Sequence, residues 1–140
     1  MLKKLFKKKN KISNNENILI IALLVHAAKI DENYTDSEKE IIKKVIIQLN
    51  KVNLEESEKL LKLAEKKEEE SNQIVEFTKE VKKYSMEFRL KIIEIIWKIV
   101  YSDGASDNYE SNLMRRICGL LYISDKDNGI IKTKVQDLPK

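Results

Sequence analysis

One pattern occurs twice in this sequence: LLVHAAKIDENYTDSEKEIIKKV at residues 23–45 and IIWKIVYSDGASDNYESNLMRRI at residues 95–117, an offset of 72 residues. In each copy an apolar run is followed by an acidic stretch and then by apolar residues at helical spacing. Both copies place an aspartate seven residues before a glutamate, as Asp31 and Glu38 and as Asp103 and Glu110. Each copy therefore predicts a buried helix, a short acidic loop and an amphipathic helix.

Apolar residues at helical spacing occur both within and outside the two copies. It predicts helices at residues 15–30, 41–49, 54–64, 74–84, 86–101 and 113–121, and a last short helix opened by Ser124. The third of these helices takes its apolar face from Leu54, Leu60, Leu61, Leu63 and Ala64. Three glycines and one proline leave few turn residues for β-hairpins. We predict an all-α fold, a compact bundle of about seven helices with an internal pseudo-twofold helix–loop–helix duplication.

Charge divides the chain into two parts. Residues 1–13 hold six lysines and no acid, which leaves 21 basic and 23 acidic residues in the rest of the 140-residue chain. We predict a basic flexible arm at residues 1–14 and one helical domain at residues 15–137. Because the domain itself is mildly acidic, the basic overall charge does not predict nucleic-acid binding by the fold.

The acidic loops have a simple structural interpretation, which is helix capping. Thr35-Asp-Ser-Glu38 and Asp107-Asn-Tyr-Glu110 both have the spacing of a capping box. In that motif the first side chain accepts from the backbone amide of the third helical residue, and the glutamate reaches back. Gly104 would supply the left-handed turn after the preceding helix. Capping explains four of the acidic-loop residues without any ligand.

Asp31 and Asp103 are explained less well by capping. Each follows the C-terminal end of an apolar helix, where the helix dipole disfavours an anion. A lysine, a backbone donor or a bound divalent cation could compensate the charge. The spacing excludes an EF-hand, because Ile42 and Met114 stand where that motif requires a bidentate glutamate.

The metal interpretation assigns five ligands to one or two sites made of hard oxygen donors. If the two loops meet across a pseudo-twofold axis, they could share one site. The candidate ligands are Asp31, Glu38, Asp103, Asp107 and Glu110.

No catalytic constellation is recognised in the sequence, and we expect a protein without enzymatic activity. Cys118 lies in an apolar stretch, which indicates an inert buried thiol rather than a nucleophile. The one histidine, His26, lies within an apolar run and is interpreted as a packed or capped core residue. A Cys–His pair stays open, although nothing in the local sequence supports it. No glycine-rich phosphate loop is present.

The basic arm has two interpretations. A solvated tail is the one that its composition favours. In the other, Leu2, Leu5 and Phe6 lie against an anionic membrane with the lysines around them, which are Lys3, Lys4, Lys7, Lys8, Lys9 and Lys11. The longest purely apolar run, residues 18–25, is too short to span a bilayer. We therefore expect a cytoplasmic protein, with peripheral contact at the inner face of the membrane under the second interpretation.

The second copy in its context, SMEFRLKIIEIIWKIVYSDGASDNYESNLMRRICGLLYISDKD, resembles the TerB family of tellurite-resistance-associated proteins. The shared elements are an aspartate–glycine after a Trp-containing helix, a glutamate seven residues after that aspartate, and an apolar helix ending in a Leu-Leu-x-Ile-Ser-like turn. The first copy has Glu32 where the family has glycine, and the resemblance covers residues 16–136. It implies a seven-helix domain related to the N-terminal domain of membrane-associated DnaJ-like co-chaperones.

The resemblance also implies a function. It points to a cytoplasmic stress-response module whose acidic surface binds divalent cations or recruits protein partners. Carried over by motif, the candidate positions are Asp31, Glu38, Asp103 and Glu110, with Asp107 as a weaker addition. The alternative is a purely structural interaction domain without a metal site, which would meet its partner through the charged helix around residues 55–70.

Overall fold

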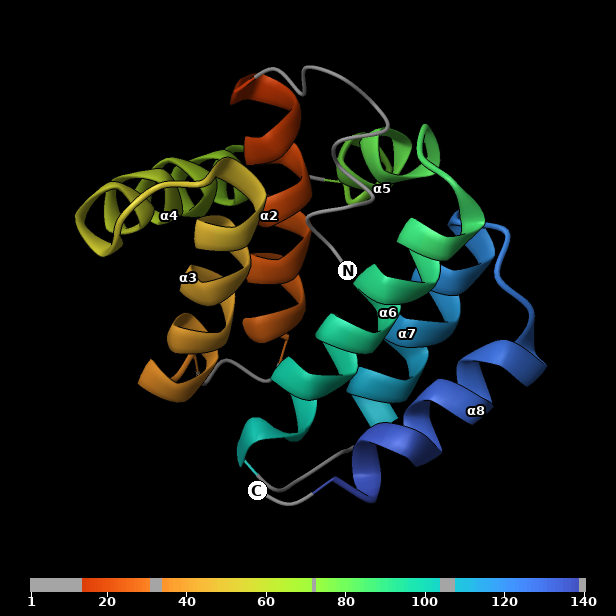
Figure 1. Cartoon of the computed structure of the whole chain (residues 1–140). Coiled ribbons are helices and arrows are strands. Elements are labelled where there is room, and N and C mark those ends of the chain that lie inside the picture. The colour runs from red at the N-terminus through yellow and green to blue at the C-terminus, as the bar shows by residue number, and fades with distance from the viewer. Residues whose placement is uncertain (1–13, 31–33, 72, 104–107, 139–140) are drawn as a thin grey trace.

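The computed structural model describes residues 14–30, 34–71, 73–103 and 108–138, and these ranges contain seven α-helices and no strand (Figure 1). The helices are α2 (Asn14–Ala28), α3 (Asp36–Asn50), α4 (Leu54–Glu70), α5 (Val75–Lys82), α6 (Met86–Val100), α7 (Asn108–Leu120) and α8 (Asp125–Gln136), and the short 3-10 helix η1 (Tyr101–Asp103) follows α6. The predicted all-α fold is confirmed.

Side-chain caps start four of these helices. Thr35, Asn53, Ser85 and Ser124 each have an extended backbone and accept a hydrogen bond from the backbone amide three residues later. Such caps are typically worth about 1 kcal/mol each, since they satisfy a backbone donor that the helix leaves unpaired. The predicted cap of the last helix by Ser124 is confirmed.

Two central helices, α2 and α6, form the core. Residues 20–25 of α2 and 92–97 of α6 are buried, and α6 contacts α2, α3, α5, α7 and α8. Helices that are apolar on most sides must be covered on most sides, which explains this arrangement. The expected face of α4 is wrong in part: Leu54 and Leu63 are each 54% exposed. The buried face of α4 instead follows Ser57, Leu61 and Ala64, spaced as one side of a helix requires.

The helix boundaries repeat at the offset seen in the sequence. Helix α2 begins at residue 14 and ends at residue 28, while α6 begins at 86 and ends at 100. Helices α3 and α7 begin at residues 36 and 108, again 72 residues apart. The two copies thus form the same pair of elements, and the pseudo-twofold relation between them stays a prediction.

Helix length limits how the chain can meet a membrane. The longest helix, α4, has 17 residues and is strongly charged, and the apolar helices α2 and α6 have 15 each. A bilayer needs about 20 apolar residues in a helix that spans it. No helix in the described ranges is both long and apolar enough to cross a membrane.

Candidate functional site

The first acidic loop leads into a complete capping box. The Thr35 amide donates to Glu38 Oε1 at 2.7 Å, and the Glu38 amide donates to Thr35 Oγ1 at 3.1 Å. Glu38 is almost fully buried, at 2% exposure. The capping prediction is confirmed here, so Glu38 has a structural role whether or not it also contacts a ligand.

Helix α4 braces the C-terminal end of α2, just before this loop. His26 Nδ1 lies 3.1 Å from Glu68 Oε2, and Lys29 Nζ lies 3.1 Å from Glu68 Oε1. His26 lies in the last turn of α2, and Lys29 directly follows the helix. A positive charge at this end interacts favourably with the helix dipole. His26 therefore has a polar partner, Glu68, but its side chain is 30% exposed, so the prediction of a core histidine is wrong. The pairing crosses 42 residues of sequence, so helical spacing could not reveal it.

The residue that follows the loop is also anchored on α4. Tyr34 donates its phenol proton to Glu65 Oε2 at 2.6 Å. Burial, this hydrogen bond and the negative charges of Glu65, Glu38 and Glu68 raise the pKa of Tyr34 well above its usual value. Three carboxylates from two helices thus act on one side chain beside the loop that contains Asp31. This concentration of negative charge would attract a cation, although Lys29 and Lys39 lie near the Tyr34 ring.

The second acidic loop is described only at its borders. Asp103 ends the 3-10 helix η1, and Glu110 lies in the first turn of α7. The side chains of these two residues, together with Asp31, Gly104 and Asp107, lie outside what the structure describes. Within the described ranges, no group of three or more His, Cys, Asp and Glu side chains could hold a metal ion. Of the five predicted ligands, Glu38 is the one whose side chain is described.

The borders of the two loops lie at the same end of the molecule. The end of α2, the start of α3 and the end of α6 all point to the lower edge of Figure 1. Helix η1, which leads into the second loop, contacts α3, which follows the first loop. The packing therefore brings together the elements that begin and end the loops.

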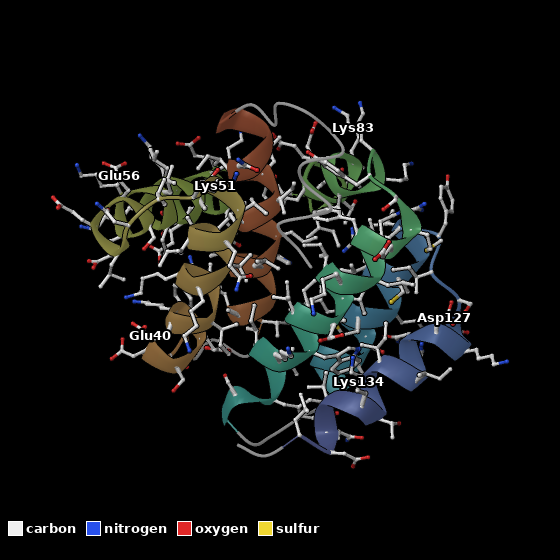
Figure 2. The ribbon with its side chains drawn as sticks, viewed as in Figure 1. Glu40, Lys51, Glu56, Lys83, Asp127 and Lys134 are labelled. Atoms are coloured by element: carbon white, nitrogen blue, oxygen red, sulfur yellow. The ribbon has the colours of Figure 1, made fainter. Side chains whose placement is uncertain are left out.

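A second polar cluster, which the sequence did not reveal, is centred on Glu94 of α6. Its carboxylate lies 3.3 Å from Lys91 Nζ, 3.2 Å from Lys98 Nζ and 3.1 Å from Lys134 Nζ. Of these residues, Lys134 is labelled in Figure 2, on α8. Burial alone would raise the pKa of Glu94, but the three lysines outweigh it and lower the pKa to about 2. The cluster fastens α8 to α6, and all its charges are paired within the protein.

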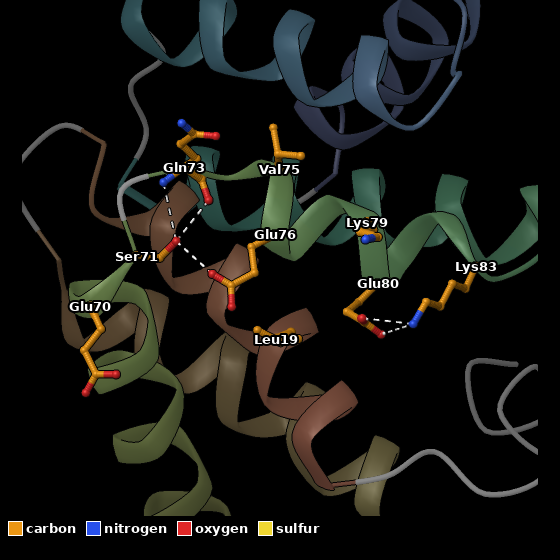
Figure 3. Close-up of a pocket in the computed structure, with 9 residues that line it drawn as sticks. All are labelled: Leu19, Glu70, Ser71, Gln73, Val75, Glu76, Lys79, Glu80 and Lys83. Carbon is orange, nitrogen blue, oxygen red and sulfur yellow. Dashed lines mark hydrogen bonds and ion pairs between the residues drawn. The ribbon is translucent and has the colours of Figure 1, made fainter.

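A hollow with a volume of about 750 Å³ lies between α2, α4 and α5 (Figure 3). Ser71 Oγ lies 3.0 Å from the Gln73 carbonyl oxygen and 3.2 Å from Glu76 Oε2. Glu80 pairs with Lys83 at 3.0 Å and Glu76 with Lys67 at 3.3 Å, so these charged groups of the rim already have partners. No histidine or cysteine lines this hollow, and its residues do not form a nucleophile with a base.

The isolated cysteine and histidine do not form a pair. Cys118 is 1% exposed, and burial, with a smaller contribution from Asp125, raises its thiol pKa to about 12. A thiol with such a pKa stays protonated and is a poor nucleophile. The prediction of a buried thiol is confirmed, whereas its lack of reactivity stays a prediction. His26 Nδ1 is held by Glu68 instead.

Helix order, acidic loops and apolar pattern define a small all-α domain built on a repeated helix pair. Residues 17–133 match the family described as tellurite resistance protein TerB, and the chain belongs to the TerB family. No curated protein and no solved structure matches the chain. Family membership confirms the resemblance drawn from the second copy and its context.

Proposed function

We propose that this chain is a non-enzymatic module of a tellurite-resistance-like stress response that binds a divalent cation and docks protein partners. The proposal extends the family membership of residues 17–133. In this proposal Asp31, Glu38, Asp103, Asp107 and Glu110 supply the oxygen ligands. Carboxylates and backbone carbonyls are the donors that calcium and magnesium prefer.

One observation carries the metal proposal: Glu38, Glu65 and Glu68 all act on Tyr34, directly beside the loop that contains Asp31. Gathering carboxylates costs free energy through mutual repulsion unless cations offset it. Lys29 offsets the charge of Glu68. A bound cation at the loop would offset the remaining charge, including that of Asp31 at the C-terminal end of α2.

The proposal has a direct thermal test. Chelator-stripped full chain is melted alone and with calcium, magnesium, manganese or zinc, alongside Asp31→Asn/Asp103→Asn. A ligand that binds only the native state raises stability, by about 2.7 kcal/mol at a hundredfold excess over Kd. We expect one cation to raise the melting temperature by several degrees and the double variant to lose that rise. Asp36→Asn/Asp125→Asn, which removes two exposed acids outside the predicted set, should keep it.

The capping box favours a second candidate function, a protein-interaction domain without a metal site. Thr35 and Glu38 satisfy each other there without any ion. In this alternative the chain is a co-chaperone-like interaction domain. It contacts its protein partner through the charged face of α4. A melt that no cation shifts, with the asparagine variant as stable as the parent chain, would favour this alternative.

We also propose that the protein works in the cytoplasm and touches the inner face of the membrane through its basic arm. The six lysines of residues 1–13, together with Leu2, Leu5 and Phe6, support this contact. Each lysine near an anionic surface contributes about 1 kcal/mol, and the contribution falls as salt screens the charges. The contact would therefore be reversible and salt-sensitive.

A further inference from the structure

Two neighbouring helices, α5 and α7, expose basic residues. On α5, Lys79 and Lys82 are exposed on the same side as Val75, at spacings of four and three residues. On α7, which ends at Leu120, Arg115 is exposed, and the exposed Tyr122 follows the helix. Helices α5 and α7 are in contact, and Lys82 Nζ lies 5.0 Å from the centre of the Tyr122 ring. We call the surface of Lys79, Lys82, Arg115 and Tyr122 the basic α5–α7 face.

Among the described residues, no ion pair neutralises the positive charges of this face. The ion pairs between described residues involve neither Lys79 nor Lys82 nor Arg115. The two glutamates of α5 that could reach them are paired elsewhere, Glu76 with Lys67 at 3.3 Å and Glu80 with Lys83 at 3.0 Å. The face therefore presents three positive charges to whatever lies outside the protein.

Tyr122 occupies a backbone position that disfavours a large side chain. It is in the left-handed conformation, with φ of 58°, directly after α7. The bonds from Ile123 N to Cys118 O at 2.9 Å and from Tyr122 N to Gly119 O at 3.3 Å form a Schellman motif, whose left-handed residue is usually glycine. The Tyr122 side chain is 69% exposed and gains little from packing. An exposed aromatic residue that costs backbone free energy points to a role outside the fold.

Helix α5 also packs against α2. Leu19 of α2 lines one hollow with Lys79 and Lys83 of α5 (Figure 3). Helix α2 begins at Asn14, five residues before Leu19, which is only about 7 Å along a helix axis. The start of α2, which the six lysines of residues 1–13 precede in the sequence, therefore lies near α5.

We propose that the basic α5–α7 face lies against an anionic lipid surface, with Tyr122 at the level of the headgroups. This proposal rests on the membrane contact proposed for the arm and adds the folded domain to it. Lysine is a point charge suited to a diffuse negative surface, whereas recognition of single carboxylates or phosphates relies on paired arginine forks. Tyrosine is amphipathic and suits the boundary between headgroups and water. Lipid is therefore favoured over an acidic protein as the partner.

The test is flotation of the full chain with vesicles of pure phosphatidylcholine and of equal parts phosphatidylcholine and phosphatidylglycerol. We expect Lys82→Gln/Arg115→Gln to weaken binding to the anionic vesicles about tenfold to thirtyfold, given roughly fivefold per basic residue. The matched control is Lys44→Gln/Lys62→Gln, which removes the same charge from exposed positions on α3 and α4. We expect the control to bind almost as the parent chain does.

Tyr122→Gly separates a contact role from a folding role. Because glycine adopts the left-handed conformation readily, this variant should melt no lower than the parent chain. Its binding to anionic vesicles should nevertheless fall several-fold, since the aromatic contact is lost. Weakened binding together with an undiminished melting temperature is the expected signature of a membrane-contacting Tyr122.

Three results would overturn the inference. If replacing the arm lysines with glutamine abolishes binding while the face and control variants bind alike, the arm alone contacts lipid. If the full chain binds both vesicle types equally weakly, the membrane contact of the arm fails as well. If the vesicles are not bound but poly-glutamate is, in a way that depends on Lys82 and Arg115, the face serves an acidic protein instead.

Discussion

The two helix–loop–helix copies differ in how a third helix braces them. In the first, α4 binds both borders of the acidic loop, through Glu68 to His26 and through Glu65 to Tyr34. In the second, α8 binds the middle of α6, through Lys134 to Glu94. The same apolar pattern therefore builds the same helix pair twice, while polar residues outside the pattern decide which part of each pair is fixed.

Equivalent positions show the difference most clearly. His26 and Lys98 are 72 residues apart, and each pairs with a glutamate. The partner of His26 comes from α4, whereas the partner of Lys98 lies four residues earlier in its own helix. The equivalent residues therefore differ in the kind of partner they have. His26 links α2 to another helix beside the acidic loop, whereas Lys98 forms an ion pair within α6.

The largest expected effect tests what the copies share. Leu24 and Ile96 are equivalent in the alignment, and both are fully buried. Leu24→Ala and Ile96→Ala should each lower the free energy of unfolding by ~2–5 kcal/mol, through lost burial and the cavity left behind. Urea unfolding measures both values. A loss below about 1 kcal/mol at either site would contradict the central position of that helix.

The second largest expected effect is a pH dependence of stability, which tests the contact between Glu94 of α6 and Lys134 of α8. The folded pKa of Glu94 is about 2, below its usual value of 4.5, so its stabilisation is full above the usual value and is lost as pH falls toward 2. A shift of this size corresponds to about 3 kcal/mol at neutral pH. Urea unfolding from neutral pH down to about pH 3 should show the decline in the parent chain and a smaller one in Glu94→Gln. Equal declines in both would show that Glu94 is not responsible.

A smaller effect tests the brace of the first copy. Tyr34→Phe removes the hydrogen bond to Glu65 and should lower the free energy of unfolding by ~1–2 kcal/mol, since a bond to a charged acceptor is stronger than a neutral one. The control is Tyr122→Phe, which removes a hydroxyl from a largely exposed side chain. Thermal melts of the two variants compare them directly. Equal melting temperatures would mean that Glu65 does not hold the border of the loop.

The smallest expected effect concerns the connection between α3 of the first copy and α4, the helix that packs against it. Lys51, between α3 and α4, has a left-handed backbone with φ of 53°. Lys51→Gly should raise the free energy of unfolding by ~0.5–1 kcal/mol, because glycine adopts this conformation without steric cost. Lys44→Gly, in the interior of α3, should instead lower it by about 1 kcal/mol. A destabilised Lys51→Gly would indicate that the lysine side chain contributes contacts of its own.

Local sequence determined the helices, because their apolar spacing and side-chain caps act within a few residues. The central positions of α2 and α6, the capping box of Thr35 and Glu38 and the buried Cys118 were all predictable in this way. The spacing was insufficient where a helix packs against few neighbours, so Leu54 and Leu63 of α4 are exposed.

Only the tertiary structure decided the polar partners. Pairs such as His26 with Glu68 and Glu94 with Lys134 join residues 42 and 40 positions apart, and charged residues are too common in this sequence for spacing to select one partner. The basic α5–α7 face likewise depends on two helices that meet only in the folded chain. Helix formation is a local balance of propensity and apolar pattern, whereas charge pairing depends on which surfaces the core brings together.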